Sequence, residues 1–333
     1  MDVNRRQGIA RIADSFRRLA IAICSIAIAI PLFAHAQTFP SKPIRLIVGF
    51  PPGGVMDIYA RSLANQLQER LKNPVVVENR AGAGGLVGAD AVIKSAPDGY
   101  TLTHIVPSTV TTVFMPDVPF DVFKALQPIS SVWAAPFVLT VNTQVPSNSI
   151  REFVDHAKAF PGKLNFGSSN GPNYLPMVLF NHLAGIKLES IEYKGAQVMN
   201  TALFTNEIQA TINTYQSVLP FMKSGKLRVL AVTGSERFPV LPDVPTMTEA
   251  GYAGMDDLQS VGGIFAPAGV PASVAAVLQA AFRSIVASPE TERLVRDSGR
   301  PLLVSNDEFI NILRKEVAAW ERAAKVSGTS ARR

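Results

Sequence analysis

The chain has 333 residues and a formal net charge of +6, from 32 basic and 26 acidic side chains. Residues 1–36 carry five arginines and two aspartates, so the remaining 297 residues keep 27 basic and 24 acidic side chains, a net charge of +3. With no Lys/Arg cluster on a predicted face, this charge argues against nucleic-acid binding. A chain of this length exceeds the usual size of a single core, so two domains are expected.

Residues 1–36 have the form of a signal peptide. A basic start precedes an almost unbroken apolar run from Leu19 to Phe33, and Ala34-His35-Ala36 has the small–x–small pattern of a cleavage site. The run is about 15 residues long, short for a bilayer-spanning anchor, which is the alternative. We expect cleavage before Gln37 and export to the periplasm. Because Cys24 is the only cysteine, the mature chain is expected to have no disulfide and no thiol-based metal site.

The stretch from Ile44 to Leu71 predicts a buried strand, a loop and an amphipathic helix. Apolar residues alternate over residues 44–50 and recur at spacings of three and four over residues 56–71. Between them, Pro51-Pro52-Gly53-Gly54 has no bulky side chain. The first N–H groups of a helix lack partners within it, so this loop is suited to a small anion such as a carboxylate. An ordinary strand–helix turn that needs glycine for its geometry is the alternative.

Strands and helices continue to alternate along the rest of the chain, which predicts an α/β fold with mostly parallel sheets. The expected strands cover residues 75–78, 101–105, 137–141, 163–166, 208–212, 229–233 and 262–266. The expected helices cover residues 86–94, 150–159, 274–286 and 307–325, with another ending near Leu183. Ser147 or Ser149 is expected to cap the helix at 150–159. Residues 233–251 are rich in Pro, Gly and polar side chains and are expected to cross the surface.

Six motifs occur in a fixed order: FPPGGVMDIYAR, VVVENRAGAGGLVGAD, PDGYTL, YKG, GKLRVLAVTGSERFPVLPDVPTMTEAG and FAPAGVP. Together they resemble the Bug family of periplasmic solute-binding proteins, the extracytoplasmic receptors of tripartite tricarboxylate transporters. The resemblance extends over residues 39–325. It implies a periplasmic binding protein type II fold, in which two Rossmann-like α/β lobes are joined by two crossover segments and close over a small ligand, often a carboxylate.

The resemblance also implies how the chain is divided and where a ligand binds. Lobe one is expected to combine residues 37–138 and 262–333, lobe two to cover 139–261, and the crossings to lie near 135–142 and 258–264. In the family, two strand–helix loops grip the carboxylate through backbone amides and water, and they match residues 51–57 and 167–173. The expected ligand-binding residues are Pro52, Gly53, Gly54, Val55, Asp57, Ser108, Thr109, Ser168, Ser169, Asn170, Gly171, Gly195 and Tyr215.

Several of these residues have a structural alternative. Asp57 either points into the cleft or caps its own helix. Ser108 and Thr109 end a strand on the same edge, and a plain polar turn explains them equally well. Tyr215 is either a cleft residue or part of the core. Arg80, after a predicted strand, is expected to pin the loop backbone together with Asn79, with direct ligand contact as the alternative.

The sequence departs from the family pattern at places that bear on the ligand. Met56 stands where Ser or Thr is usual, Tyr174 where a His is expected and Val178 where Glu is common. A Trp usual in the returning segment is missing at residues 259–262. Since Met56, Tyr59 and Tyr174 make the pocket more apolar, we expect a monocarboxylate with an aliphatic or aromatic body rather than a di- or tricarboxylate.

Rival motifs are weaker. Residues 167–171 match the G-x-S-x-G nucleophile elbow, but a secreted hydrolase using Ser169 needs an acid and then a His, and the last histidine, His182, lies only 13 residues further on. The glycines at 82–88 miss the dinucleotide fingerprint at Val87. No His pair has metal-ligand spacing. We therefore expect no enzyme activity, no cofactor and no metal.

The expected partners follow from the resemblance. They are a small organic acid and the large and small integral membrane subunits of a transporter, with the receptor itself a monomer. The alternative to import is a ligand sensor that is not coupled to a transporter.

Overall fold

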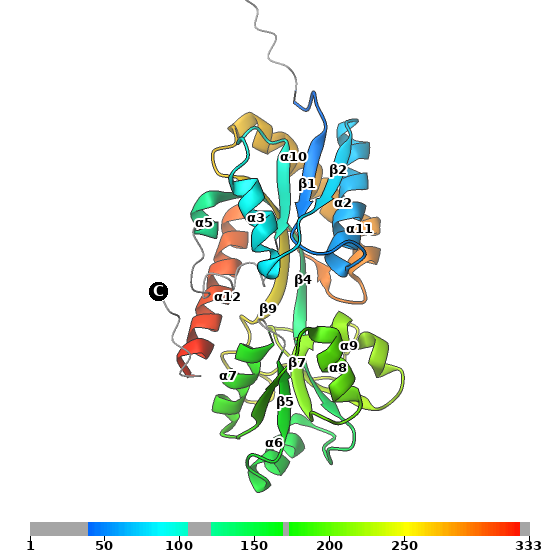
Figure 1. Ribbon diagram of the computed structural model, residues 1–333, viewed down its shortest axis with the longest axis vertical. Coiled ribbons are helices and arrows are strands. Elements are labelled where there is room, and N and C mark those ends of the chain that lie inside the picture. The colour runs from blue at the N-terminus through cyan, green and yellow to red at the C-terminus, as the bar shows by residue number, and fades with distance from the viewer. Residues whose placement is uncertain (1–38, 106–120, 169–172, 327–333) are drawn as a thin grey trace, which may run out of the picture. The chain divides into compact units, whose positions relative to one another are not determined.

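A computed structural model describes residues 39–105, 121–168 and 173–326 (Figure 1). Residues Lys42–Arg333 form one compact unit, separate from Met1–Ser41. The expected signal peptide and its cleavage site lie outside the described residues.

Ten strands form a continuous hydrogen-bonded sheet in the order β2-β1-β3-β9-β4-β7-β5-β6, with β8 and β10 also paired to β4. The strands are β1 (Ile44–Val48), β2 (Val75–Asn79), β3 (Thr101–Ile105), β4 (Leu126–Asn142), β5 (Asn165–Ser168), β6 (Glu189–Glu192), β7 (Ala210–Thr214), β8 (Leu227–Val232), β9 (Gln259–Pro267) and β10 (Arg300–Pro301).

The α-helices around this sheet are α2 (Val55–Leu71), α3 (Leu86–Ile93), α5 (Val122–Ala125), α6 (Ile150–Ala159), α7 (Tyr174–Ala184), α8 (Ala196–Phe204), α9 (Tyr215–Met222), α10 (Ala272–Val286), α11 (Pro289–Val295) and α12 (Asn306–Val326). At the start of α6 the Ser149 hydroxyl accepts the Glu152 N–H, so Ser149 is the cap, as one of the two sequence alternatives predicted.

The long strand β4 divides the sheet into two sections. Its first part pairs with β9, ending at Pro136 opposite Gln259, and this first section includes β1, β2, β3 and β10. From Phe137, opposite Thr214, β4 pairs with β7 and β8, and this second section includes β5 and β6. One strand thus leaves the first section at Pro136–Phe137, and another returns to it from Gln259. The two-lobed α/β fold is confirmed.

The expectation of mostly parallel sheets is wrong for the middle of the molecule. Strands β1, β2 and β3 are parallel, as are β5, β6 and β7, but β4 and β9 are antiparallel to every partner described for them. The reason is connectivity: β4 and β9 run between the sections in opposite directions, so they pair side by side without a crossover helix.

Helix α12 packs against both sections. Its first half, with Phe309 and Leu313, lies in the core formed by α3, α5, β3 and β9. Its second half, with Trp320, lies in the core of the second section, where the Trp320 ring meets Phe137 edge to face at 6.3 Å. In Figure 1 this helix is the red ribbon that runs alongside β9 and ends beside α7.

Candidate functional site

The loop between β1 and α2 is held by one buried carboxylate. Gly53 has a φ of +78°, a conformation that suits glycine, and its N–H donates to Asp57 Oδ2 at 2.9 Å. The same oxygen accepts from Arg61 Nε at 2.9 Å, and Asp57 Oδ1 accepts from Asn79 Nδ2 at 2.8 Å. Asn79 also donates to the Phe50 carbonyl, so it pins the loop as expected. The carboxylate of Asp57 thus joins the loop, its helix and β2.

The surroundings of Asp57 keep it ionised. The hydrogen bond from Arg61, with those from Gly53 and Asn79, lowers the pKa of Asp57 from its usual 3.8 to about 2, although burial acts in the opposite direction. Both carboxylate oxygens of Asp57 already accept hydrogen bonds from within the chain, so the role of Asp57 is to shape the loop. Arg80 does not pin the loop through its side chain, because its Nε donates to Glu78 Oε1 at 2.6 Å.

The free donors of this loop belong to the start of α2. The N-cap residue of α2 is Gly54. Because glycine has no side chain, no cap side chain accepts a hydrogen bond from the first N–H groups of this helix. Among the described residues, the N–H groups of Gly54, Val55 and Met56 have no hydrogen-bond acceptor. Pro52, Gly53 and Gly54 are exposed and Val55 is half-buried. The N–H of Gly53 is already committed to Asp57, so the donors open to a ligand are those that follow it.

The second section presents three more helix starts beyond strand ends. Helices α7, α8 and α9 follow β5, β6 and β7, and none carries a side-chain cap. Since β5 is parallel to β6 and to β7, their carboxyl ends share one edge. Side-chain amides connect the segments at this edge. Asn173 donates a hydrogen bond to the Ile212 carbonyl, and Asn200 donates one to the Ser217 carbonyl.

Two of the expected ligand residues on the second section, Ser168 and Gly195, are described here by their positions in the structure. Ser168 is buried at the end of β5, with its hydroxyl 3.4 Å from that of Ser190. Gly195 caps α8 with a φ of +152°, and the space where a side chain would project is open. Ser169, Asn170 and Gly171 lie outside the described residues, as do Ser108 and Thr109 of the first section.

Tyr215, the first residue of α9, belongs to the core, which is one of its two sequence interpretations. It is 6% exposed and packs edge to face on Phe238, so it is part of the core. It also lines an open pocket of about 530 Å³, whose other walls come from the rest of α9, from Lys223 and Val240 of the second section, and from Asp297, which follows α11 of the first section. A smaller cavity of about 70 Å³ lies around Pro136, Gln259 and Arg300, where β4 and β9 pass between the sections.

The glycine-rich segment after β2 is a packing joint. A Cβ on Gly49 would lie 2.6 Å from the Gly85 backbone, and one on Gly88 would lie 2.8 Å from Gly49. The loops that follow β1 and β2 therefore touch backbone to backbone, as the interpretation of a tight strand–helix joint predicts.

An aromatic cluster of Tyr59, Trp133 and His104, which no sequence pattern predicted, lies beside α2. Trp133 of β4 fills the space over Gly262, where an added Cβ would lie 2.2 Å from Nε1 of the indole. The missing Trp of the returning strand is thus matched by a Trp on its neighbour. The Trp133 N–H donates to His104 Nε2 at 3.2 Å, so the His104 proton is on Nδ1, which has no partner. Burial lowers the pKa of His104 to about 4 and keeps the ring neutral.

Neither a metal site nor a membrane span is found in the part of the chain that the structure describes. No group of three His, Cys, Asp or Glu side chains there is placed to hold a metal. No single described helix is long and apolar enough to cross a membrane; helices α10 and α11 pass such a test only as a pair, with a 67° bend between them.

Two α/β sections connected by β4 and β9, with uncapped helix starts beyond parallel strand ends, define a two-lobed solute-binding protein. Comparison with known proteins specifies the family. Residues 59–328 match the model of the tripartite tricarboxylate transporter family receptor, TctC, and the chain belongs to this family of solute-binding receptors.

Individual relatives agree with this assignment. The chain is 34% identical to Protein BugT of Bordetella pertussis over 316 residues, covering 93% of this chain and 96% of BugT. A Rhodopseudomonas palustris protein solved with adipate superposes with a TM-score of 0.75 at 27% identity, over 87% of this chain and 98% of that one. MatC from Rhodopseudomonas palustris with bound malate gives a TM-score of 0.71 at 26% identity, over 86% and 99% of the two chains.

Proposed function

We propose that this protein is a periplasmic receptor that captures a small organic acid between its two sheet sections and delivers it to the large and small membrane subunits of a transporter. The observation that carries the proposal is the set of uncapped helix starts: α2 on the first section, and α7, α8 and α9 on the second. Residues 50–57 and 167–173 contain no Lys or Arg, so amides, hydroxyls, water and helix dipoles must bind the anion.

Hydrogen bonds to a charged acceptor are strong enough for this purpose, at about 1.5–3 kcal/mol each. The proposed binding residues on the first section are Pro52, Gly54 and Val55, with Gly53 and Asp57 shaping the loop. On the second section they are Ser168, Gly195 and Tyr215. The proposed lobes are residues 37–138 with 262–333 and residues 139–261, and the proposed functional unit is an exported monomer.

The ligand class is the finer part of the proposal. Relatives have been solved with adipate and with malate, both dicarboxylates. Met56 and Tyr174 are partly exposed beside the two loops, whereas Tyr59 is enclosed and offers no wall to a ligand. Because Met56 and Tyr174 remain as apolar groups, we propose a carboxylate with an aliphatic or aromatic body.

Calorimetry of the refolded mature protein against benzoate, adipate, malate and citrate tests both the receptor role and the proposed ligand class. Binding of at least one acid is expected, with benzoate or adipate tighter than malate and citrate. Met56→Ser should weaken the apolar acid and improve malate by several-fold each, whereas Val76→Ser, an exposed position on β2, should change neither. Tight citrate binding alone would overturn the apolar pocket, and no binding of any acid would overturn the receptor role.

A further inference from the structure

Residues 297–299, which follow α11, are fixed on the first section. The Ser298 hydroxyl forms a hydrogen bond of 2.5 Å with the Tyr59 hydroxyl of α2. Tyr59 is the fifth residue of α2, about 6 Å along the helix from its first residue. On the other side, a Cβ on Gly299 would lie 2.3 Å from a carbonyl oxygen of β4, so backbone packs directly on backbone. The segment that carries Asp297 is therefore held between α2 and β4.

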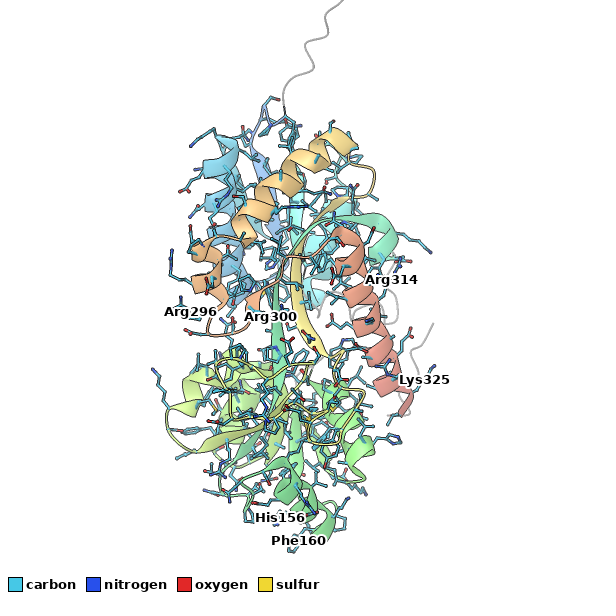
Figure 2. All side chains as sticks on the ribbon, turned by 180° about the vertical axis from the view of Figure 1, so that it is seen from behind. His156, Phe160, Arg296, Arg300, Arg314 and Lys325 are labelled. Carbon is cyan, nitrogen blue, oxygen red and sulfur yellow. The ribbon has the colours of Figure 1, made fainter. Side chains whose placement is uncertain are left out.

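The negative charge of Asp297 is not neutralised within the described chain. In the residues that the structure describes, its exposed carboxylate forms no ion pair. Arg296 and Arg300, which mark this connection in Figure 2, lie near it in sequence but are not paired with it. Lys223 is the C-cap residue of α9, eight residues and about 12 Å along the helix from Tyr215.

Asp297 lines a pocket that belongs mostly to the second section. The pocket is open, has a volume of about 530 Å³ and includes Tyr215, the first residue of the uncapped helix α9. It therefore adjoins the start of α9 and, through the fixed segment, the second turn of α2. Apart from Lys223, its other walls are apolar and consist of Leu219, Pro220 and Val240. Apolar walls with a few charged groups are typical of a site for a small molecule.

The charge of Asp297 acts beside both helix starts. Burial is the main reason that the pKa values of Tyr215 and Tyr59 lie above the usual value, and the Asp297 carboxylate raises both further. A negative charge beside helix starts that capture an anion repels a second carboxylate and attracts a cationic group. The ligand that suits this arrangement carries its own positive charge, separated from its carboxylate by an apolar body.

We propose that the pocket is the far subsite of the acid-binding site, where Asp297 pairs with a protonated amine at the end of the ligand's apolar body and disfavours a second carboxylate there. The subsite rests on the proposed function, since the helix starts must hold the ligand's carboxylate. The ligand class is a zwitterion such as an ω-amino acid, in contrast to the adipate and malate bound to the relatives described above. Asp297 sets the choice among acids, whereas the helix starts hold the carboxylate that all of them share.

Calorimetry of the refolded mature protein can compare acids that differ only at the far end. Hexanoate, 6-aminohexanoate and adipate share one chain length and end in a methyl group, an amine and a carboxylate, and benzoate with 4-(aminomethyl)benzoate forms an aromatic pair. We expect 6-aminohexanoate to bind about tenfold tighter than hexanoate, which corresponds to about 1.4 kcal/mol, and adipate to bind no tighter than hexanoate. The preference for the amine should fall as salt is added, because Asp297 is exposed.

A charge-removing variant tests whether Asp297 causes this preference. Asp297→Asn keeps the size of the side chain, and the ratio of the affinities for 6-aminohexanoate and hexanoate should fall close to one. Because the result is a ratio between two acids, a general loss of stability cannot produce it. Asp155→Asn removes the same charge from an exposed position on α6 and should keep the tenfold ratio.

Several outcomes would overturn the subsite. They are a preference that survives in Asp297→Asn, no preference for the amine in a pair that binds, and tightest binding of adipate with a loss in Lys223→Gln, since a cation would then hold the far end. Binding of malate or citrate but of none of these five acids would also overturn the subsite and would leave the receptor role intact. No binding of any acid would overturn the receptor role itself.

Discussion

Helices α2 and α12 each bury one carboxyl group, and the surroundings of the two groups are opposite. Asp57 on α2 is 3% exposed and accepts hydrogen bonds from Arg61, Asn79 and the Gly53 N–H. Glu316 on α12 is 1% exposed; among the described residues, only the Trp320 indole donates to it, at 3.4 Å, and Oε2 has no partner. The pKa of Asp57 is lowered to about 2, whereas burial raises the pKa of Glu316 well above its usual value.

The difference shows what each carboxyl group contributes. A charge is kept in the interior when donors surround it, and at α2 those donors are Gly53 of the loop, Arg61 of the helix and Asn79 of β2. A carboxyl group among apolar residues holds its proton instead, and at α12 it lies between Leu313 and Trp320 on the buried side of the helix. The first carboxylate holds a loop, a helix and a strand together, and the second is tolerated in a core.

The largest expected effect is at Asp57. Asp57→Ala removes the acceptor of the Gly53 N–H and of Arg61, so we expect a loss of about 2–3 kcal/mol in the free energy of unfolding and at least tenfold weaker binding of the acid identified by calorimetry. Asp90→Ala is the matched control, since Asp90 also pairs with a basic residue four positions on but is only half-buried. Its change should stay within about 0.5 kcal/mol. Equal losses in the free energy of unfolding for Asp57→Ala and Asp90→Ala would contradict the special role of the buried Asp57 carboxylate.

The loop of Asp57 was predictable because its signals are local. The alternation over residues 44–50, the Pro-Pro-Gly-Gly sequence and the helix spacing all lie within one short stretch, and the structure gives β1 and α2 nearly at the expected bounds. The first part of β4 was missed, because Pro128, Ser130 and Ser131 interrupt its apolar pattern.

The features of the structure that the sequence did not predict depend on contacts between residues that are distant along the chain. Ser298 lies 239 positions from Tyr59, and no pattern in either segment indicates the other. Trp133 reaches Gly262 and His104 only because β9 lies between β3 and β4. Short helices such as α8 and α9, and the strand β6, are stabilised by this packing more than by their own sequences, so periodicity did not predict them.

The second effect in size is the acid sensitivity of the first section. With a folded pKa of about 2 against an ordinary 3.8, ionised Asp57 contributes about 2 kcal/mol to the free energy of unfolding. This contribution is complete above about pH 4 and is lost as the pH falls towards 2, because the unfolded chain takes up the proton first. Urea unfolding between pH 6 and pH 2.5 should show a smaller acid slope in Asp57→Asn than in the unaltered protein. Parallel curves for the two proteins would contradict the assignment.

The smallest effect is expected at Glu316, and it has the opposite sign. Below about pH 4.5 both the folded and the unfolded chain hold the proton, so the group makes no difference there. As the pH rises, the unfolded chain ionises while the folded one keeps its proton, and the free energy of unfolding falls. Glu316→Gln cannot ionise and keeps the acceptor for the Trp320 N–H. Its melting temperature at pH 7.5 should therefore exceed that of the unaltered protein by a few degrees, since about 1 kcal/mol corresponds to about 2–4 °C.

The same comparison at pH 4 should show little difference, and Glu308→Gln, an exposed position on the same helix, should show none at either pH. A destabilised Glu316→Gln at pH 7.5 would mean that the carboxylate is ionised and paired in the folded chain. The contrast with Asp57 would then fail, because both groups would be stabilised charges. A gain at pH 7.5 that disappears at pH 4 cannot come from better packing, which does not depend on pH, and would assign the effect to the buried proton itself.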